Sequence, residues 1–267
     1  MAEMMKGNEA IAEAAIRAGA RFYAGYPITP SSEIMEYLSW RMNEVGGAFV
    51  QAESELAGIN MVIGASSCGV RALTASSGPG ISLKQEGIST LCDEGLPAVV
   101  ITQVRYGNGL GTLFTSQCDY HRETRGGGQG DYRCIVLCPS SIQEFVDLML
   151  PAYELAEKYR IVTIMMGEGT LGQMMEPVEL PDFVEPKRTP WALNGHYTYK
   201  KIGIFERDSM AEAVELRAKY AEIKENEQRW EEEDIADADY VFVAYGVPGR
   251  ATLGAVRELR AAGEKVG

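Results

Sequence analysis

Residues 70–80 read VRALTASSGPG, a short, mainly apolar run that passes directly into a turn of glycine and proline. A buried strand followed by a tight turn is the simplest interpretation of this pattern. Residues 81–94, which come next, favour a helix. The order of strand, turn and helix predicts one unit of an α/β sheet in the middle of the chain.

Similar runs occur on both sides of this unit, separated by helical or glycine-rich segments. They are RFYAGYP (21–27), AFVQA (48–52), PAVVITQV (97–104), CIVLCPS (134–140) and RIVTIMMG (160–167). Each is short and apolar enough for a buried strand. Helices are expected over the alanine-rich segment that ends at Gly19, behind Pro30, and from Glu53 to Ile63. Residues 1–190 are therefore predicted to form an α/β domain with a largely parallel sheet flanked by helices.

The character of the chain changes after Gly172, where four prolines up to Pro190 make long regular elements improbable. Residues 191–236 are expected to form a linker and a charged helix. Its apolar stripe would contain Met210, Ala213, Val214, Tyr220, Ile223 and Trp230. Residues 237–267 predict a strand, DYVFVAYG, and a helix from Arg250 to Ala262. One such unit cannot cover its own apolar faces, so we expect a second α/β domain that is incomplete at Gly267.

The composition limits the function. The net charge of −13 repels nucleic acids and anionic membranes, and no run approaches the roughly 20 apolar residues that span a bilayer. We therefore expect a cytoplasmic protein. Its five cysteines are scattered and its two histidines, His121 and His196, occur in no metal-binding motif. Neither a zinc site nor an iron–sulfur cluster is expected within this chain.

Four places at predicted strand ends or in loops are candidates for chemistry: the turn that contains Thr29, Glu55, Arg105 and the glycine-rich stretch RGGGQGDY. Thr29 lies between Pro27 and Pro30, although helix capping alone would explain it. Glu55 begins a helix with apolar neighbours, where many glutamates merely favour the helix N-terminus. Arg105 follows an apolar strand, and either a bound carboxylate or a structural salt bridge would suit it. The nearby glycines match no phosphate-binding motif.

At these same places the sequence resembles the 2-oxoacid:ferredoxin oxidoreductase family, specifically the subunit with the pyrimidine-binding domain. The resemblance covers residues 6–132. Its segments are GNEAIAEAAIRAG, YPITPSSE, ESELAGINMVIGAS, ASSGPGISLKQEGIS, the stretch from Arg105 through SQCDY, and RGGGQGDY. The run DYVFVAYG is similar to the start of the family's transketolase-C-terminal-like domain.

The resemblance implies thiamine diphosphate bound between two domains, of which this chain carries the one that meets the pyrimidine ring. Glu55 would hydrogen-bond that ring and act as a general acid/base by relay. Pro27 would pack against the ring, while Thr29 and Arg105 would contact the substrate. Diphosphate and Mg²⁺ would be held by a diphosphate-binding catalytic subunit. A gamma-type subunit and a ferredoxin-like iron–sulfur subunit would complete the complex, with coenzyme A and ferredoxin as acyl and electron acceptors.

Substrate choice is the remaining question. The loop over residues 106–132 is most similar to the 2-ketoisovalerate type, although Cys118 stands where many relatives have glycine. A 2-oxoglutarate enzyme would offer a second cation, for which Arg122 and Arg125 are candidates, and pyruvate is a further alternative. A non-oxidative thiamine diphosphate decarboxylase subunit and a catalytically silent scaffold are the rival interpretations.

Overall fold

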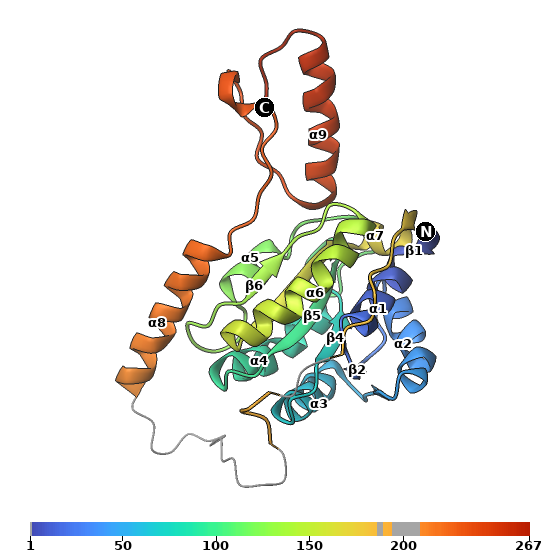
Figure 1. The fold of residues 1–267 in the computed structure, drawn as a ribbon, viewed down its shortest axis with the longest axis vertical. Coiled ribbons are helices and arrows are strands. Elements are labelled where there is room, and N and C mark those ends of the chain that lie inside the picture. The colour runs from blue at the N-terminus through green and yellow to red at the C-terminus, as the bar shows by residue number, and fades with distance from the viewer. Residues whose placement is uncertain (1, 186–188, 194–208) are drawn as a thin grey trace.

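The computed structural model describes residues 2–185, 189–193 and 209–267, and strands alternate with helices over most of the chain (Figure 1). The strands are β1 (Glu3–Lys6), β2 (Phe22–Gly25), β3 (Ala48–Gln51), β4 (Ala72–Ser76), β5 (Ala98–Val104), β6 (Ile135–Leu137), β7 (Val162–Glu168) and β8 (Met175–Val178). The helices are α1 (Gly7–Arg17), α2 (Ser32–Glu44), α3 (Glu55–Ser67), α4 (Pro79–Asp93), α5 (Tyr120–Arg125), α6 (Ile142–Tyr159), α7 (Gly169–Gln173), α8 (Ser209–Asn226) and α9 (Gly246–Ala261), with a short 3₁₀ helix η1 (Ile235–Asp237).

The main sheet has six parallel strands in the order β3-β2-β4-β5-β7-β6. Its two seven-residue strands, β5 and β7, pair along their whole length and are buried throughout. Strands that are apolar on both faces are typical of a parallel sheet covered by helices on both sides. The predicted α/β fold with a largely parallel sheet is therefore confirmed, and each of its predicted strands is present.

Two layers of helices cover this sheet. Helix α1 packs between α2 and α6, and α3 packs against α4, β2 and β4. Figure 1 shows α6 crossing in front of the sheet, with α3 and α4 at its lower edge. The inner face of α1 is made of alanines, among them Ala10, Ala14 and Ala15, all fully buried. Small side chains let the neighbouring helices approach closely.

A second, two-stranded sheet was not expected from the sequence. Strand β1 pairs antiparallel with β8, and Met4 lies opposite Pro177. The proline-rich stretch after Gly172 thus holds a short strand, because proline is tolerated where a strand does not need to donate on both sides. Residues 186–188 of this proline-rich stretch and residues 194–208 of the predicted linker lie outside the described residues.

Helix α8 is the predicted charged helix. The prediction of its apolar stripe is correct for some of the named residues and wrong for others. Tyr220 and Ile223 pack against the core, and the Tyr220 hydroxyl accepts a hydrogen bond from the Arg133 amide at 2.9 Å. Met210 and Val214 are instead exposed, and Trp230 lies beyond the end of the helix. The helix therefore docks through its second half.

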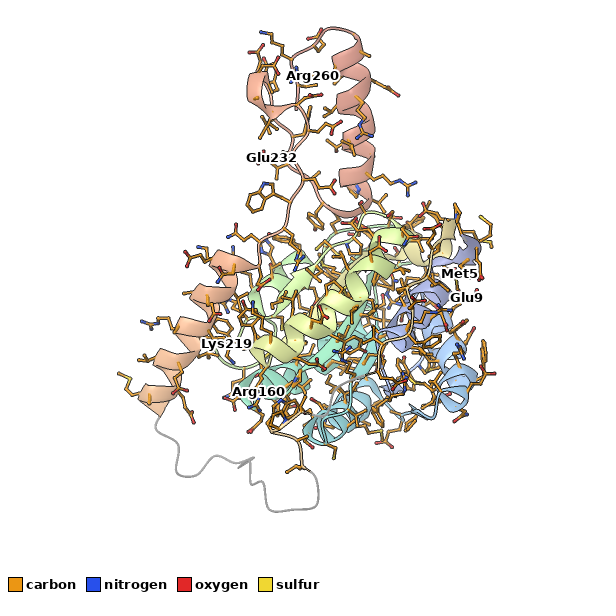
Figure 2. The ribbon with its side chains drawn as sticks, viewed as in Figure 1. Met5, Glu9, Arg160, Lys219, Glu232 and Arg260 are labelled. Atoms are coloured by element: carbon orange, nitrogen blue, oxygen red, sulfur yellow. The ribbon has the colours of Figure 1, made fainter. Side chains whose placement is uncertain are left out.

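The C-terminal unit, residues 235–267, lies beyond the end of α8 and projects from the main body of the chain, which it meets at the first turn of α9 (Figure 1). The predicted strand DYVFVAYG is wrong as an extended strand, since the described residues pair only at a parallel bridge between Tyr240 and Val266. The predicted helix begins earlier than expected, at Gly246. Arg260, labelled in Figure 2, ties this unit together through an ion pair of 2.9 Å with Asp237.

Candidate functional site

The carboxyl ends of β2, β4 and β5 lie side by side, so the turns that follow these strands meet at one edge of the sheet. These turns are YPITPSS after β2, SSGPG after β4 and RYGNGLG after β5. In open α/β sheets, ligands bind at this edge. The fold therefore gathers the candidate residues into one region.

Glu55 is the first residue of α3, as predicted. Its neighbour Ser54 caps the helix by accepting a hydrogen bond from the Ala57 amide at 3.2 Å. The glutamate is only 6% exposed, and none of the described residues donates a hydrogen bond to its carboxylate. A buried carboxylate of this kind is costly unless a donor reaches it. Glu55 is thus placed to accept a hydrogen bond from a bound group.

Gly80, in the first turn of α4, forms the surface on which the Glu55 carboxylate lies. A Cβ atom at this position would be 2.6 Å from Glu55 Oε1 and 2.1 Å from Ser76 Oγ. A side chain at position 80 would therefore displace the carboxylate or the serine. The SSGPG turn fits Glu55 because its last residue has no side chain.

Lys84 lies one turn further along α4 and is fully buried. Its Nζ donates a hydrogen bond of 3.3 Å to the carbonyl oxygen of Glu55. Burial lowers the pKa of Lys84 to about 8, and the nearby charge of Glu55 opposes this change. Sequence reasoning missed this residue. The available signal was its spacing with Ile81 and Ile88, which places all three on one face of the helix.

Arg105 bridges the turn after β2 and the loop after β5. Its Nη1 donates a hydrogen bond of 2.8 Å to the carbonyl oxygen of Thr29, and its Nη2 donates to that of Leu110. The side chain also passes Gly78, where an added Cβ would lie 3.0 Å from Arg105 Nε. Arg105 and Glu55 therefore approach the same SSGPG turn, Arg105 at Gly78 and Glu55 at Gly80.

Thr29 does not cap the following helix. Helix α2 begins at Ser32 with Ser31 as its N-cap residue, two positions later than the capping interpretation requires. Ser31 closes the turn through its amide and hydroxyl, both of which donate to the Ile28 carbonyl at 2.9 Å. Thr29 and Pro27 are exposed on this turn. The structure brings Thr29 to Arg105, and Pro27 lies two residues before it.

Arg122 approaches the same turn from α5. It donates to the Gly78 carbonyl at 2.9 Å and forms ion pairs of 2.9 Å with Asp119 and with Glu123. Glu123 is buried, and this burial raises its pKa. Arg125 is exposed at the end of α5. Arg122, one of the two arginines considered for binding a second substrate carboxylate, is therefore already paired with acidic residues of its own chain.

Cys118 fits the loop without a left-handed backbone, since the described non-glycine residues with positive φ are Arg160 and Asp234. Its thiol donates to the Arg105 carbonyl at 3.3 Å. A glycine is not required at this position. The cysteine at this position instead adds a contact to the backbone of Arg105.

Glu168, at the carboxyl end of β7, is a further buried acid that sequence reasoning missed. It accepts hydrogen bonds from Gln117 Nε2 at 2.7 Å and from the Val247 amide at 3.3 Å. Gln117 also donates to the Tyr245 carbonyl at 3.0 Å. This network connects the loop after β5 to the first turn of α9.

The described residues contain no group of three or more His, Cys, Asp or Glu side chains placed to hold a metal ion. Cys134 lies 3.8 Å from Cys92, sulfur to sulfur, and both belong to the set of free thiols. In the same described ranges, no helix is long and apolar enough to cross a membrane.

Comparison with known proteins places these features in context. Residues 13–239 match the family described as pyruvate flavodoxin/ferredoxin oxidoreductase, thiamine diphosphate-binding. Ketoisovalerate oxidoreductase subunit VorB of Methanothermobacter marburgensis is 48% identical over 272 residues, which is 99% of this chain and 77% of the relative. 2-Oxoglutarate synthase subunit KorA of Methanocaldococcus jannaschii is 38% identical over 298 residues, 99% of this chain and 80% of that protein.

One solved structure is similar over almost the whole chain. It is the 2-oxoglutarate:ferredoxin oxidoreductase of Magnetococcus marinus with 2-oxoglutarate, coenzyme A and succinyl-CoA bound, with a TM-score of 0.88 and 26% identity. The match covers 99% of this chain and 52% of the solved chain, so the present sequence spans about half the length of that protein.

Proposed function

The chain belongs to the pyruvate flavodoxin/ferredoxin oxidoreductase family through its thiamine diphosphate-binding domain, and we propose that it presents the pyrimidine-facing half of the cofactor site in a 2-oxoacid:ferredoxin oxidoreductase. The reaction is the oxidative decarboxylation of 2-ketoisovalerate, with coenzyme A as acyl acceptor and ferredoxin as electron acceptor. The observation that carries the proposal is the meeting of Glu55, Arg105 and Thr29 around the SSGPG turn.

Glu55 fits the role of partner to the aminopyrimidine ring. Its carboxylate is buried, receives no hydrogen bond from the described residues and lies against a glycine, so a flat ring could approach it. A carboxylate in this position exchanges a proton with the ring nitrogen and so acts as a general acid/base by relay. Thiamine diphosphate, when bound, supplies the nucleophilic carbon that attacks the keto group and the ring that accepts electrons as CO₂ leaves.

Arg105 receives the substrate carboxylate. A guanidinium carries five N–H donors, and the backbone carbonyls of Thr29 and Leu110 hold the terminal nitrogens in place. The Nε donor is buried beside Gly78, so the second N–H of each terminal nitrogen is the donor left to bind an oxyanion. Thr29 presents its hydroxyl near the 2-keto oxygen, and Pro27 shapes the turn against the cofactor ring.

The substrate has an apolar side chain. Arg122 is paired with Asp119 and Glu123, so it does not offer a free charge to a second carboxylate. The loop after β5 instead presents Leu110, Leu113 and Phe114, all largely exposed. These features support 2-ketoisovalerate. A 2-oxoglutarate enzyme is the second candidate, favoured by the similarity to the solved structure that contains 2-oxoglutarate.

Other parts of the enzyme come from partner subunits. A diphosphate-binding catalytic subunit holds the diphosphate and Mg²⁺, and a ferredoxin-like iron–sulfur subunit and a gamma-type subunit complete a cytoplasmic complex. In this chain, residues 1–190 form the pyrimidine-binding domain and 191–236 the connection. Residues 237–267 begin a transketolase-C-terminal-like unit, supported by the parallel bridge between Tyr240 and Val266 on either side of α9.

The test is to purify the complex through this chain and measure viologen reduction with 2-ketoisovalerate, pyruvate and 2-oxoglutarate, each with and without coenzyme A and thiamine diphosphate. We expect reduction that depends on both additions, with 2-ketoisovalerate as the best substrate. The chain by itself should bind thiamine diphosphate poorly. Carbon dioxide release without viologen reduction, in a complex loaded with iron, would instead indicate a non-oxidative decarboxylase.

A further inference from the structure

Lys84 is an unusual residue to find in the interior of this domain. Its side chain is fully buried, and the described residues give its ammonium group a single hydrogen bond, 3.3 Å from the Glu55 carbonyl oxygen. Removing an ammonium group from water is costly unless an anion or several acceptors replace the water. An apolar side chain of the same length would fill this space at a lower cost. Packing alone therefore does not account for Lys84.

The position of Lys84 connects it to both the backbone and the side chain of Glu55. It lies four residues after Gly80, so both project from the same face of α4. Gly80 borders the Glu55 carboxylate, while Lys84 holds the Glu55 carbonyl. The charge of Glu55 in turn favours the protonated form of Lys84 and raises its pKa against the effect of burial. Helix α4 thus fixes both the backbone and the side chain of the same glutamate.

We propose that Lys84 is a positioning residue for Glu55: its ammonium group anchors the first turn of α3 through the Glu55 carbonyl oxygen and so keeps the Glu55 carboxylate against Gly80. The inference rests on the proposed role of Glu55 at the cofactor ring. A carboxylate that is held in one place can exchange a proton with the ring nitrogen without first being reoriented. Lys84 therefore supports the proton relay without touching the cofactor.

This role makes activity depend on the protonation of Lys84. The pKa of Lys84 is about 8, and Glu55 on α3 is the charged group that acts on it among the described residues. Above this pH the ammonium loses its proton, so its hydrogen bond to the Glu55 carbonyl oxygen weakens and the first turn of α3 is held less firmly. Turnover of the assembled complex should therefore fall above about pH 8 and level off near the turnover of a variant that lacks the ammonium group.

The experiment compares wild type, Lys84→Met and Lys84→Arg in the assembled complex, measuring viologen reduction from pH 6 to 10. Lys84→Met should lower turnover at least about tenfold at pH 7 and remove the alkaline decline. Lys84→Arg should restore part of the rate and stay active to higher pH, because a guanidinium keeps its charge. Lys158→Met is the matched control, since Lys158 is exposed and pairs with Glu227, and it should behave as wild type.

Binding of thiamine diphosphate, measured by calorimetry on the same complexes, separates the possible failures. Lys84→Met should bind the cofactor within about threefold of wild type, because Lys84 acts on Glu55 and does not hold the cofactor. A wild-type complex that binds no thiamine diphosphate would overturn the proposed function itself. Normal binding with an unchanged rate and pH profile in Lys84→Met, or loss of binding in that variant, would overturn the role of Lys84 alone.

Discussion

The guanidinium of Arg105 donates a hydrogen bond of 2.8 Å to the carbonyl oxygen of Thr29, which connects the loop after β5 to the turn after β2. The two residues are 76 positions apart in the sequence, and the parallel sheet brings them together because β4 alone lies between their strands. Arg105 also donates to Leu110 within its own loop. Its orientation is therefore set by the backbone on both sides before a substrate arrives.

Replacement of Arg105 by alanine should lower kcat/KM for 2-ketoisovalerate about tenfold to a hundredfold, since a hydrogen bond to a charged group contributes about 1.5–3 kcal/mol. Steady-state viologen reduction measures this effect. The affinity for thiamine diphosphate should not change. Arg125→Ala, which alters an exposed arginine nearby, serves as the control. Loss of cofactor binding in Arg105→Ala would show that Arg105 contacts the cofactor and not the substrate.

Replacement of Glu55 by glutamine should reduce turnover about 10²–10⁴-fold, the range typical for removal of a general acid/base. The amide has nearly the same shape, so the complex should still assemble, as size-exclusion chromatography will show. Glu53→Gln, which changes an exposed glutamate two residues away, should remain active. Equal turnover in the two variants would remove Glu55 from the mechanism.

Replacement of Gly80 by alanine should displace the Glu55 carboxylate, because the new Cβ would lie 2.6 Å from Glu55 Oε1. We expect turnover to fall at least about tenfold, since misplacing a catalytic group is costly. Gly64→Ala is the control: Gly64 is in α3, and an added Cβ would meet no atom within 4 Å. That change should stabilise the chain by about 0.5–1 kcal/mol. An active Gly80→Ala enzyme would mean that Glu55 tolerates movement.

The lowered pKa of Lys84 predicts that the free energy of unfolding depends on pH. Its pKa is lowered from 10.5 to about 8 in the folded chain, so between these values the unfolded chain binds a proton that the folded chain has released. Stability of wild type relative to Lys84→Met should therefore rise across this window, by about 3 kcal/mol in all. Urea unfolding of both chains from pH 7 to 11 measures the difference. A constant difference would show that Lys84 is hydrated in the folded state.

The strands of the main sheet were predictable because each is a short apolar run bounded by turn residues, as PAVVITQV is. Strands β1 and β8 were not, because each has four residues and is defined by its pairing partner, with Pro177 obscuring one of them. The run after Asp239 has the composition of a strand, but a sequence pattern does not show whether a partner lies beside it. Among the described residues, Tyr240 of that run forms a bridge with Val266, and the Phe242 amide donates to the Gly267 carbonyl oxygen at 2.8 Å, which is too short a contact to make an extended strand.

The sequence predicted some residues of the candidate site and missed others. Glu55, Thr29 and Arg105 follow recognisable elements and match family motifs, so their places at the sheet edge could be predicted. Their roles in the reaction stay predictions. Lys84 and Glu168 were missed because lysine and glutamate are usually exposed, and a residue-by-residue interpretation assigns them to the surface. Their burial follows from the inner face of helix α4 and from strand β7 lying in the interior, which is a property of the whole fold.

The hydrogen-bond network of Glu168, Gln117 and Tyr245 has a consequence for how the molecule opens. If α9 leaves the sheet, Glu168 loses the Val247 amide and Gln117 loses the Tyr245 carbonyl in the same event. Each lost partner leaves a polar group unsatisfied, at a cost of about 1–3 kcal/mol. The start of α9 and the loop that carries Arg105 and Cys118 should therefore exchange their amide hydrogens with solvent as one cooperative unit.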